Sequence, residues 1–407
     1  MILTSLSLTN FRNYVRLEID LPPHITVLQG NNAQGKTNFL EAIYYLSTAT
    51  SPRAEADRQL VHWLADQDVL PFARLVGQAV KGGEALQVEI TLMKAQNGNS
   101  HAEIMQKGIR VNGVNRRVSE LIGTIHVVLF LPQDIQIVDG SPSHRRRYLN
   151  ALLCQIDPRY YRALHKYGQV TFQRNHLLRR LRDRRQDPEQ LTFWDRQMVE
   201  MGAYILARRL WLVSHLNEVV ANIHPDLTGQ QEHLRLSYES SLELSQPLQA
   251  KDGLQWSMAL DAVEGAIPDV ARLKRAFEEQ LIARRGEEIA RGTSLIGPHR
   301  DDLRFLVNSI DMTVYGSRGQ QRTAALSAKL AEVEWLRQET GEMPILLLDD
   351  MVSELDPARR NYLLAMLAGA QQAIVTTTDV QGFPAEFLQR ATLFDVRQGQ
   401  LQLLSTP

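Results

Sequence analysis

Cysteine is almost absent from this sequence: Cys154 is the only one in 407 residues. A single cysteine excludes an intrachain disulfide and a cysteine-based metal cluster, and it suits a reducing compartment. No apolar run approaches the ~18 residues that a bilayer-spanning helix needs. The first residues also lack the basic and apolar regions of a secretory signal. We therefore expect a cytoplasmic protein without a membrane partner.

An excess of charge of either sign is also lacking. The formal net charge is −1, and the contents of hydrophobic (44%) and charged (22%) residues are ordinary for a globular protein. The overall charge therefore indicates neither a nucleic acid nor a membrane, and such a partner must be sought in local clusters. The length allows roughly two or three domains.

The pattern of apolar residues divides the chain into three stretches. Residues 1–138 read mainly as strands with period-2 alternation, and residues 139–291 read as long helices. A mixture of strands and helices returns in residues 292–407. We expect an α/β domain built from residues 1–138 and 292–407, with a mainly helical domain of residues 139–291 inserted between its two parts.

Within these stretches, apolar residues recur at three and four positions from Leu191 to Ile223, which predicts a long helix that Pro225 ends. No strict heptad is sustained, so a long coiled coil is not expected. Met312 to Val314 is predicted as a strand. The continuous apolar run Ile345 to Leu348 is typical of a strand that is buried on both faces of a parallel sheet.

A phosphate-binding loop is predicted near the N-terminus. It follows a short apolar strand (residues 25–28) and leads into a predicted helix, as the pattern G-x-x-x-x-G-K-[ST] requires. The matching residues are Gly30, Asn31, Asn32, Ala33, Gln34, Gly35, Lys36 and Thr37. Such a loop points backbone N–H groups at phosphate oxygens. Lys36 is expected to reach the β- and γ-phosphates of ATP, and Thr37 to bind Mg²⁺.

Two aspartates supply the acidic partner of this loop. Asp349 and Asp350 end the apolar strand that begins at residue 345, which lies 308 positions beyond Thr37 (345 − 37). We expect Asp349 to hold Mg²⁺, and Asp350 to act as the base or the water-positioning group. Compact P-loop enzymes place the two motifs far closer together. A large inserted domain is therefore required.

A second anion site is predicted at the start of a helix near residue 320. Ser317, Gly319 and Gln320 resemble the signature sequence of ABC ATPases, and residues 353–356 resemble the loop that crosses the same dimer interface. A serine hydroxyl and a glycine backbone at a helix N-terminus favour an anion. In ABC ATPases this site caps the γ-phosphate that is bound to the opposite subunit. We therefore expect a homodimer that forms around ATP.

Basic residues concentrate in one region. Residues 141–185 contain twelve Lys or Arg and two Asp, an excess of ten positive charges (12 − 2). The favoured interpretation is a surface that tracks DNA phosphates, with little sequence preference. The alternative is a solvated helical face whose arginines pair with acids elsewhere. The candidate DNA-binding residues are Arg145, Arg146, Arg147, Arg179, Arg180, Arg182, Arg184 and Arg185.

Together these segments resemble the RecF family, bacterial ABC-type DNA-repair ATPases related to SMC heads. The resemblance also covers the sequences of residues 10–14, 140–147, 297–302, 319–323 and 348–356. It implies a weak DNA-dependent ATPase that dimerises around two ATP molecules and acts as a switch. It further implies binding to DNA at gaps or single/double-strand junctions, and cooperation with RecR and RecO in loading the RecA recombinase.

Three positions depart from the pattern that the resemblance implies. Pro132-Gln133-Asp134 stands where Pro-Glu-Asp is expected. Gln133 lies before the insertion, where ABC proteins carry a glutamine, so it is a candidate contact to Mg²⁺. Asp350 is shorter than the usual glutamate, and Thr376-Thr377-Thr378 occupies the place of the switch histidine. Both shorter groups favour slow hydrolysis.

Two other functions remain open. An SMC-like chromosome-tethering ATPase requires a heptad-rich arm, which the inserted residues lack. An ABC subunit that serves a transporter shares the ATP motifs but leaves the arginine cluster unexplained.

Overall fold

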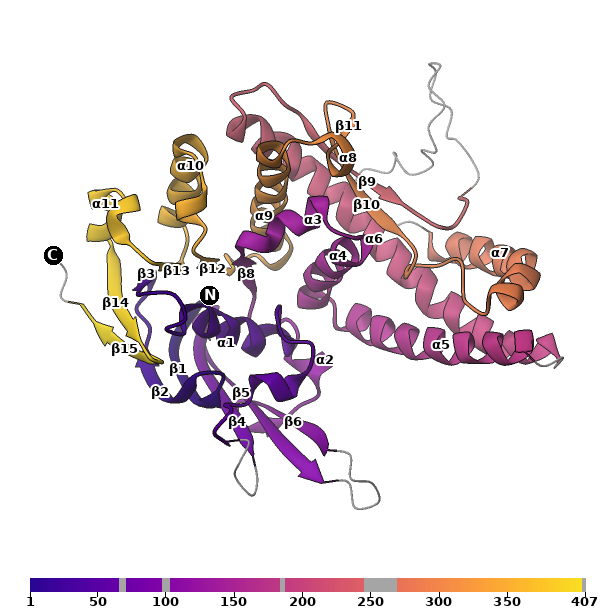
Figure 1. Ribbon diagram of the computed structural model, residues 1–407, viewed down its shortest axis with the longest axis horizontal. Helices are drawn as coiled ribbons and strands as arrows, with labels where there is room; N and C mark the ends of the chain where they lie inside the picture. The colour runs from indigo at the N-terminus through magenta and orange to yellow at the C-terminus, as the bar shows by residue number, and fades with distance from the viewer. Residues whose placement is uncertain (66–70, 97–102, 184–186, 245–268, 405–407) are drawn as a thin grey trace. The chain divides into compact units, whose positions relative to one another are not determined.

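The computed structural model describes residues 1–65, 71–96, 103–183, 187–244 and 269–404 (Figure 1). Its contacts divide the chain into two compact units. Unit 1 consists of Met1–Asp134 and Glu332–Pro407, and unit 2 of Ile135–Ala331.

The first sheet of unit 1 is antiparallel, with the strand order β2-β1-β4-β5-β6-β7. Its long strands alternate buried and exposed residues, as half-buried strands do. These long strands are β1 (Ile2–Phe11), β2 (Tyr14–Asp20), β4 (Phe72–Lys81), β5 (Glu84–Gln96) and β6 (Glu103–Val111). The short β7 (Val114–Asn115) ends the sheet.

The second sheet of unit 1 has the order β15-β14-β3-β13-β12-β8, and all its neighbouring strands are parallel except β14 and β15. Its strands are β3 (His24–Gln29), β8 (Val127–Phe130), β12 (Ile345–Asp349), β13 (Gln372–Thr377), β14 (Ala391–Arg397) and β15 (Gln400–Leu403). Every residue of β12 and β13 is buried, as the continuous apolar run in β12 predicts. Because β3, β13 and β12 are parallel, their carboxyl ends meet at one edge of the sheet.

Helix α1 (Lys36–Thr48) contacts strands of both sheets (Figure 1). Its buried Phe39 and Ile43 join one apolar cluster with residues of the first sheet, such as Leu75, and of the second, such as Leu347. This shared core fixes the start of α1 beside the carboxyl ends of the parallel strands. The other helices of unit 1 are α2 (Val118–Leu121), α10 (Pro357–Ala368) and α11 (Ala385–Gln389).

Unit 2 consists mainly of helices around a three-stranded sheet with the order β11-β10-β9. Helices α5, α6 and α7 pack against one another. The helices are α3 (Gln136–Asp139), α4 (Pro142–Ile156), α5 (Pro158–Asp183), α6 (Leu191–Leu227), α7 (Val270–Arg291) and α8 (Met312–Tyr315). Helix α9 (Arg318–Thr340) begins in unit 2 and ends in unit 1. Within the described ranges, no helix is long and apolar enough to cross a membrane.

The structure differs from the sequence-based expectation at three elements of unit 2. Residues 312–315 form α8 instead of a strand, because Asp311 caps the turn by accepting a hydrogen bond from the Thr313 amide at 2.8 Å. Helix α6 runs through Pro225 to Leu227, since proline near a C-terminus removes only its own N–H bond. A strand, β9 (Leu234–Glu239), lies in the stretch that was expected to be helical.

The strand β9 also explains where the units divide. It pairs with β10 (Asp302–Val307), and β10 pairs with β11 (Ile310–Asp311). The pairing draws residues 292–331, which the sequence pattern assigned to the α/β domain, into unit 2. The first boundary lies at residue 135, close to the expected 139.

Candidate nucleotide site

The predicted phosphate-binding loop connects β3 to α1, as the motif requires. Its backbone turns through two left-handed residues, Ala33 (φ 64°) and Gly35 (φ 115°). At Gly35 a glycine is required twice over: the φ disfavours a side chain, and a Cβ atom there would lie 2.5 Å from Nδ2 of Asn13. The tight turn leaves the first amides of α1 without intrahelical partners, which is the arrangement that binds phosphate.

The phosphate-binding loop is held by the side chains of Asn13 and of Tyr14, the first residue of β2. The Asn13 amide donates to the carbonyl of Gln34 at 3.1 Å and accepts from the Asn38 amide at 2.7 Å. The buried Tyr14 hydroxyl donates to the carbonyl of Gly35 at 2.9 Å, and burial raises the pKa of Tyr14. These hydrogen bonds hold the loop in place without a ligand. The loss of conformational entropy when phosphate binds is therefore smaller.

Lys36 folds back over the loop. Its ammonium donates to the carbonyls of Gly30 and Asn31, the latter at 2.9 Å. Burial holds the pKa of Lys36 below its ordinary value, while Asp350 and Asp349 oppose this shift. A buried ammonium with carbonyls as its hydrogen-bond partners is suited to exchange them for phosphate oxygens.

Asp349 lies opposite the first turn of α1. Its carboxylate accepts a hydrogen bond from the Thr37 hydroxyl at 2.9 Å, although 312 positions separate the two residues. A second hydroxyl, that of Thr376 on β13, donates to the same carboxylate at 2.9 Å. A hydroxyl and a carboxylate are the hard oxygen ligands that Mg²⁺ prefers, so these residues fit that ion.

The neighbouring Asp350 has a strained backbone with φ 49°. Two groups hold it there: its amide donates to the Thr376 hydroxyl at 3.0 Å, and the Ser353 hydroxyl donates to its carboxylate at 3.2 Å. One threonine hydroxyl therefore positions both aspartates. Strain of this kind is found where a side chain is aimed at a ligand.

The predicted second anion site begins α9. Ser317 and Gln320 cap the helix reciprocally: the Gln320 amide donates to the Ser317 hydroxyl at 3.3 Å, and the Ser317 amide donates to the Gln320 side chain at 3.1 Å. The Gln320 side chain also donates to Glu232 at 2.8 Å. Ser317 and Gly319 are exposed, and a Cβ atom on Gly319 would meet only the Ser317 hydroxyl, at 3.9 Å. The site is preformed and open.

Comparison with known proteins identifies the family. The family model described as RecF/RecN/SMC N terminal domain matches residues 2–399. A DNA replication and repair protein RecF from Roseiflexus castenholzii is 42% identical, over 98% of this chain and 99% of the relative. The chain belongs to the RecF family. A second relative of the same name, from Bacillus subtilis, is 37% identical over 98% of this chain and 100% of its own length.

Solved structures agree with this assignment. The recombination mediator protein RecF with ATPrS, in the RecFOR pathway, superposes with a TM-score of 0.83 at 28% identity, covering 99% of this chain and 98% of that chain. An SMC head bound to the C-winged helix domain of ScpA gives a TM-score of 0.51 at 14% identity, covering 99% and 98% of the two chains, and shows the fold alone. The expected fold class, an ABC-type ATPase head with an inserted domain, is confirmed.

In this RecF-family chain, Gln133 lies in a short 3-10 helix (Pro132–Ile135) directly after β8. Strand β8 is parallel to β12, with Phe130 opposite Leu348. Gln133 is exposed and follows the same edge of the sheet at which Asp349 ends β12. No hydrogen bond of Gln133 is seen among the described residues, so its role as an Mg²⁺ contact stays a prediction.

The candidate DNA-binding arginines have different surroundings. Arg145 is buried, and its guanidinium forms a two-pronged ion pair with Asp302 at 2.6 and 2.8 Å. Its remaining nitrogen donates to the carbonyl of Gly140 at 2.7 Å. Arg146 is half-buried and donates to the carbonyl of Asp301 at 2.8 Å. Arg145 therefore holds α4 to β10, and we do not include it in a DNA-binding surface.

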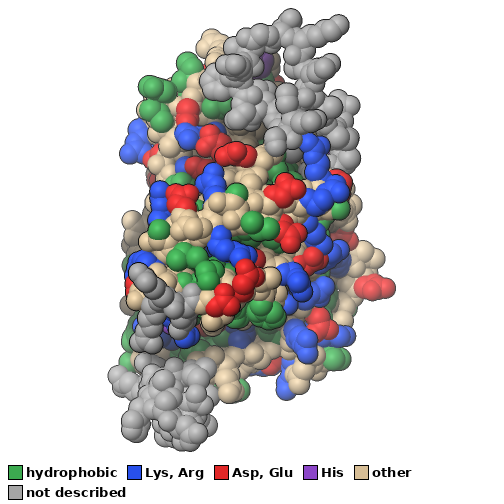
Figure 2. Space-filling model, turned by 90° about the vertical axis from the view of Figure 1, so that its right-hand side faces the viewer, with side chains coloured by type: hydrophobic (Ala, Val, Ile, Leu, Met, Phe, Trp, Pro, Cys, Tyr) green, Lys and Arg blue, Asp and Glu red, His purple; other side chains and the backbone are tan. Residues whose placement is uncertain are grey.

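Four other arginines of the set are exposed: Arg147, Arg179, Arg180 and Arg182. Arg182 pairs with its neighbour Asp183 at 2.8 Å. Arg184 and Arg185 lie outside the described residues. On the face drawn in Figure 2, basic and acidic side chains are interspersed. On that face the basic side chains therefore form no continuous surface.

Three residues of the site were missed by sequence reasoning. Asn13 and Tyr14 were noted only as part of a resemblance, and Thr376 only as a departure from a histidine. The signal for Asn13 and Tyr14 is the polar segment at the turn between two predicted strands, because binding residues often lie in loops that rigid strands position. For Thr376, the signal was weaker, since its contact with Asp349 depends on the order of strands in the sheet.

Proposed function

We propose that this chain is an ATP-gated DNA-binding protein of recombinational repair, in which ATP joins two copies on DNA and slow hydrolysis releases them. The single observation that carries the proposal is the pairing of a fixed phosphate-binding loop with an exposed signature site on the same chain. The RecF structures solved with ATP and ATPrS support the nucleotide.

At the nucleotide, different residues of unit 1 bind the phosphates, hold Mg²⁺ and position the attacking water. Backbone amides of Gly30 to Thr37 bind phosphate oxygens, and Lys36 exchanges its carbonyl partners for the β- and γ-phosphates. Thr37 and Asp349 hold Mg²⁺, which neutralises charge on the phosphates when it is bound. Asp350 orients the attacking water or accepts its proton.

Slow hydrolysis follows from two short side chains. Asp350 reaches less far than the glutamate of most ABC enzymes. Thr376 is already engaged by Asp349 and by the Asp350 amide, so its hydroxyl is not available to a γ-phosphate as a switch histidine is. We therefore propose a timed switch. A single-turnover rate above ~10 s⁻¹, a typical enzyme rate, would contradict it.

The dimer rests on the open site at the start of α9. Ser317, Gly319 and Gln320 form a preorganised cap with exposed backbone, and a second copy carrying ATP supplies its ligand. Because that ligand is the γ-phosphate of the other copy, dimerisation requires ATP and ends with hydrolysis.

DNA binding rests on exposed arginines of unit 2, among them Arg147 and Arg180. Contacts to phosphates release counterions, so affinity falls with salt and depends little on sequence. The family's pathway name supports cooperation with RecR and RecO at gaps or single/double-strand junctions, and from there a role in loading RecA. A cytoplasmic location belongs to the same proposal.

The alternative of an SMC-like tethering ATPase receives less support. The longest helix of the described residues is α6, with 37 residues, and it packs along α5 and α7 within one unit. A tether requires helices that project far beyond the head.

Sedimentation velocity of the full chain tests the proposal, with and without a non-hydrolysable ATP analogue and a gapped DNA duplex. The expected result is a monomer without the analogue, a dimer with it, and a larger species with DNA. A monomer that ignores both ligands would sink the proposal.

A further inference from the structure

Helix α5 presents a stripe of exposed polar side chains that the nucleotide site does not use. Its members follow one another at alternating spacings of four and three residues, which places them on one face of the helix. They are Arg162, Lys166, Gln169, Gln173, His176 and Arg180, and all six are exposed. From first to last the stripe is ~27 Å long, at 1.5 Å of rise per residue.

The cations of the stripe are not neutralised by acids of the neighbouring segments. Asp157, just before it, is paired with Arg208 at 3.1 Å. On α6, Glu200 is paired with Lys274 at 2.5 Å. Among the described residues, no ion pair joins Arg162, Lys166 or Arg180 to a carboxylate. The stripe therefore offers positive charge at both ends to a ligand from outside.

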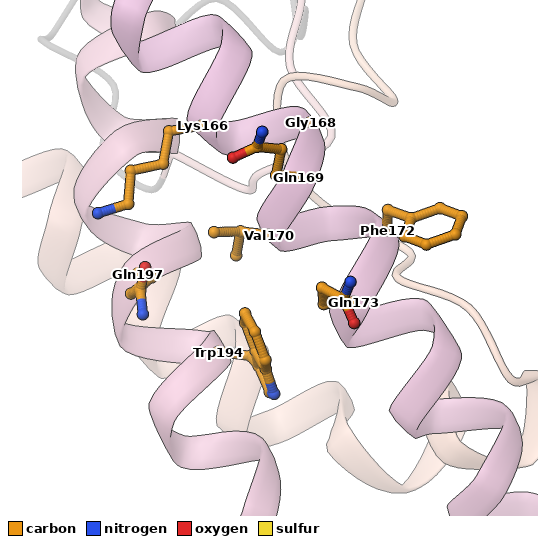
Figure 3. A pocket seen from close by; sticks show the side chains of 8 residues that line it. All are labelled: Lys166, Gly168, Gln169, Val170, Phe172, Gln173, Trp194 and Gln197. Carbon is orange, nitrogen blue, oxygen red and sulfur yellow. The ribbon is translucent and has the colours of Figure 1, made fainter. Parts of the chain in front are cut away.

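A hollow of about 550 Å³ lies halfway along the stripe, between α5 and α6 (Figure 3). Trp194 of α6 forms one wall, and Val170 of α5, which is buried, lies across from the indole. Lys166 and Gln197 stand on one side of the hollow and Gln173 on the other (Figure 3). The interior is thus apolar and aromatic, whereas the rim carries an ammonium and amide groups.

This combination is suited to an unpaired nucleobase. An indole face stacks on any base, and such stacking contributes strongly to the binding of single strands. Glutamine amides offer a donor and an acceptor side by side, which matches the edge of a base. Arg162 and Lys166 precede the middle of the stripe on α5, and Arg180 follows it. These cations lie where the phosphates on either side of the bound base would run. A duplex cannot use the hollow, because its bases are stacked and paired.

We infer that the groove between α5 and α6 binds single-stranded DNA, with one unpaired base on Trp194 and the adjoining phosphates along Lys166, Arg162 and Arg180. This inference rests on the proposed function, which it deepens by giving the single-stranded part of a gap its own site. An apolar peptide anchor is the less fitting occupant, because three glutamines and a lysine surround the hollow.

Fluorescence anisotropy tests the inference with the full chain, Mg²⁺ and a non-hydrolysable ATP analogue. Three labelled probes are compared: oligothymidylate, an abasic strand of equal length and charge, and a duplex. The wild type is expected to bind oligothymidylate about tenfold more tightly than the abasic strand. Trp194→Ala should remove this difference while leaving the abasic strand unaffected, and Lys166→Glu should weaken both single strands.

Arg196→Glu is the matched control for Lys166→Glu. Arg196 is exposed on α6 but two positions from Trp194, which turns it to the opposite side of the helix. The same change of charge there should alter binding of the single strands by no more than about twofold.

Trp194 also packs against Leu178 and its apolar neighbours, so each variant is checked by thermal melting. If Trp194→Ala does not fold, Trp194→Phe combined with Gln173→Ala takes its place, with a smaller loss on oligothymidylate. Folded groove variants that bind oligothymidylate as the wild type does would overturn the inference and favour a peptide in the groove. If the wild type binds none of the three DNA probes, the proposed function itself fails, and the inference fails with it.

Discussion

The segments Gly30–Thr37 and Ser317–Gln320 both place a glycine at the start of a helix, yet they are built differently. The first is held from outside by Asn13 and Tyr14, and it carries its own buried cation, Lys36, with a carboxylate beside Thr37. The second is exposed, and its hydrogen bonds serve mainly to begin α9. The first segment is equipped to bind a nucleotide alone, whereas the second can only complete a site that another copy brings.

The largest effect is expected at the first segment. Lys36→Met removes two charge-assisted contacts to phosphate, and ATP affinity should fall on the order of 10³-fold. Equilibrium binding of a fluorescent ATP analogue measures the loss. Lys274→Met, which removes a lysine from the surface of unit 2, should bind the analogue normally. Binding within tenfold of the wild type would show that the loop does not depend on Lys36.

At the second segment, Ser317→Arg should leave ATP affinity unchanged and weaken the ATP-dependent dimer more than ~100-fold. The reason is that a large cation would fill the exposed cap where the other copy's phosphate is expected. Sedimentation with the ATP analogue measures dimerisation. Thr192→Arg, at an exposed position on α6, serves as a control and should dimerise normally. Loss of ATP binding in Ser317→Arg would contradict the division of roles between the two segments.

The third expected effect concerns hydrolysis alone. Asp350→Asn keeps a residue that tolerates the left-handed backbone at this position, so the fold should survive. The charge that orients or deprotonates water is lost, and the single-turnover rate should fall about 100-fold. Rapid-quench measurement of ADP gives the rate, and ATP binding serves as the internal check. An unchanged rate would transfer the role to another group.

A smaller effect, on the affinity for Mg²⁺, is expected when the Thr376 hydroxyl is removed. This hydroxyl forms hydrogen bonds with both Asp349 and the Asp350 amide. Thr376→Val keeps the shape of the buried side chain but leaves Asp349 and the Asp350 amide each without one hydrogen bond. Removing such a supporting group should weaken Mg²⁺ in the ATP complex about tenfold. A titration of ATP hydrolysis with Mg²⁺ measures the shift. Thr392→Val on β14, which β3 and β13 separate from β12, should not shift the titration.

The smallest effect is expected in DNA binding, and it separates two arginines of unit 2 that lie two positions apart, Arg145 and Arg147. Arg147→Ala should reduce the slope of log affinity against log salt by about 1, with little change in stability. Arg145→Ala breaks a buried ion pair with Asp302 and should cost about 3 kcal/mol of the free energy of unfolding. DNA titrations at several salt concentrations, together with urea unfolding, measure the two quantities. If Arg145→Ala were as stable as the wild type, Arg145 would return to the candidate DNA surface.

Local signals explain what the sequence could predict. The phosphate-binding loop, the apolar strand before Asp349 and the N-terminal end of α9 each depend on a few adjacent residues, and each prediction of these elements agrees with the structure. The inserted domain followed from the distance between the first two motifs, and the ABC type from the segments at Ser317 and Ser353. A three-residue apolar pattern could not separate a strand from a helix at Met312 to Val314, where the cap at Asp311 decides.

Long-range contacts explain what the sequence could not predict. The burial of Arg145 depends on Asp302, 157 positions away, so a run of three arginines gives no hint that one of them is structural. The pairing of β9 with β10 likewise crosses the whole of α7 and moves residues 292–331 into unit 2. The threonine that holds both aspartates becomes recognisable only when β12 and β13 are known to be neighbours.

A mixing experiment tests the central claim, that each ATP site needs two copies of the chain, most directly. Lys36→Met and Ser317→Arg are sedimented with the ATP analogue, first separately and then together. Each variant alone should remain a monomer. The mixture should form a heterodimer with one nucleotide, because the loop of the Ser317→Arg copy meets the signature segment of the Lys36→Met copy. A Ser317→Arg protein that dimerises alone, or a mixture that stays monomeric, would contradict the claim.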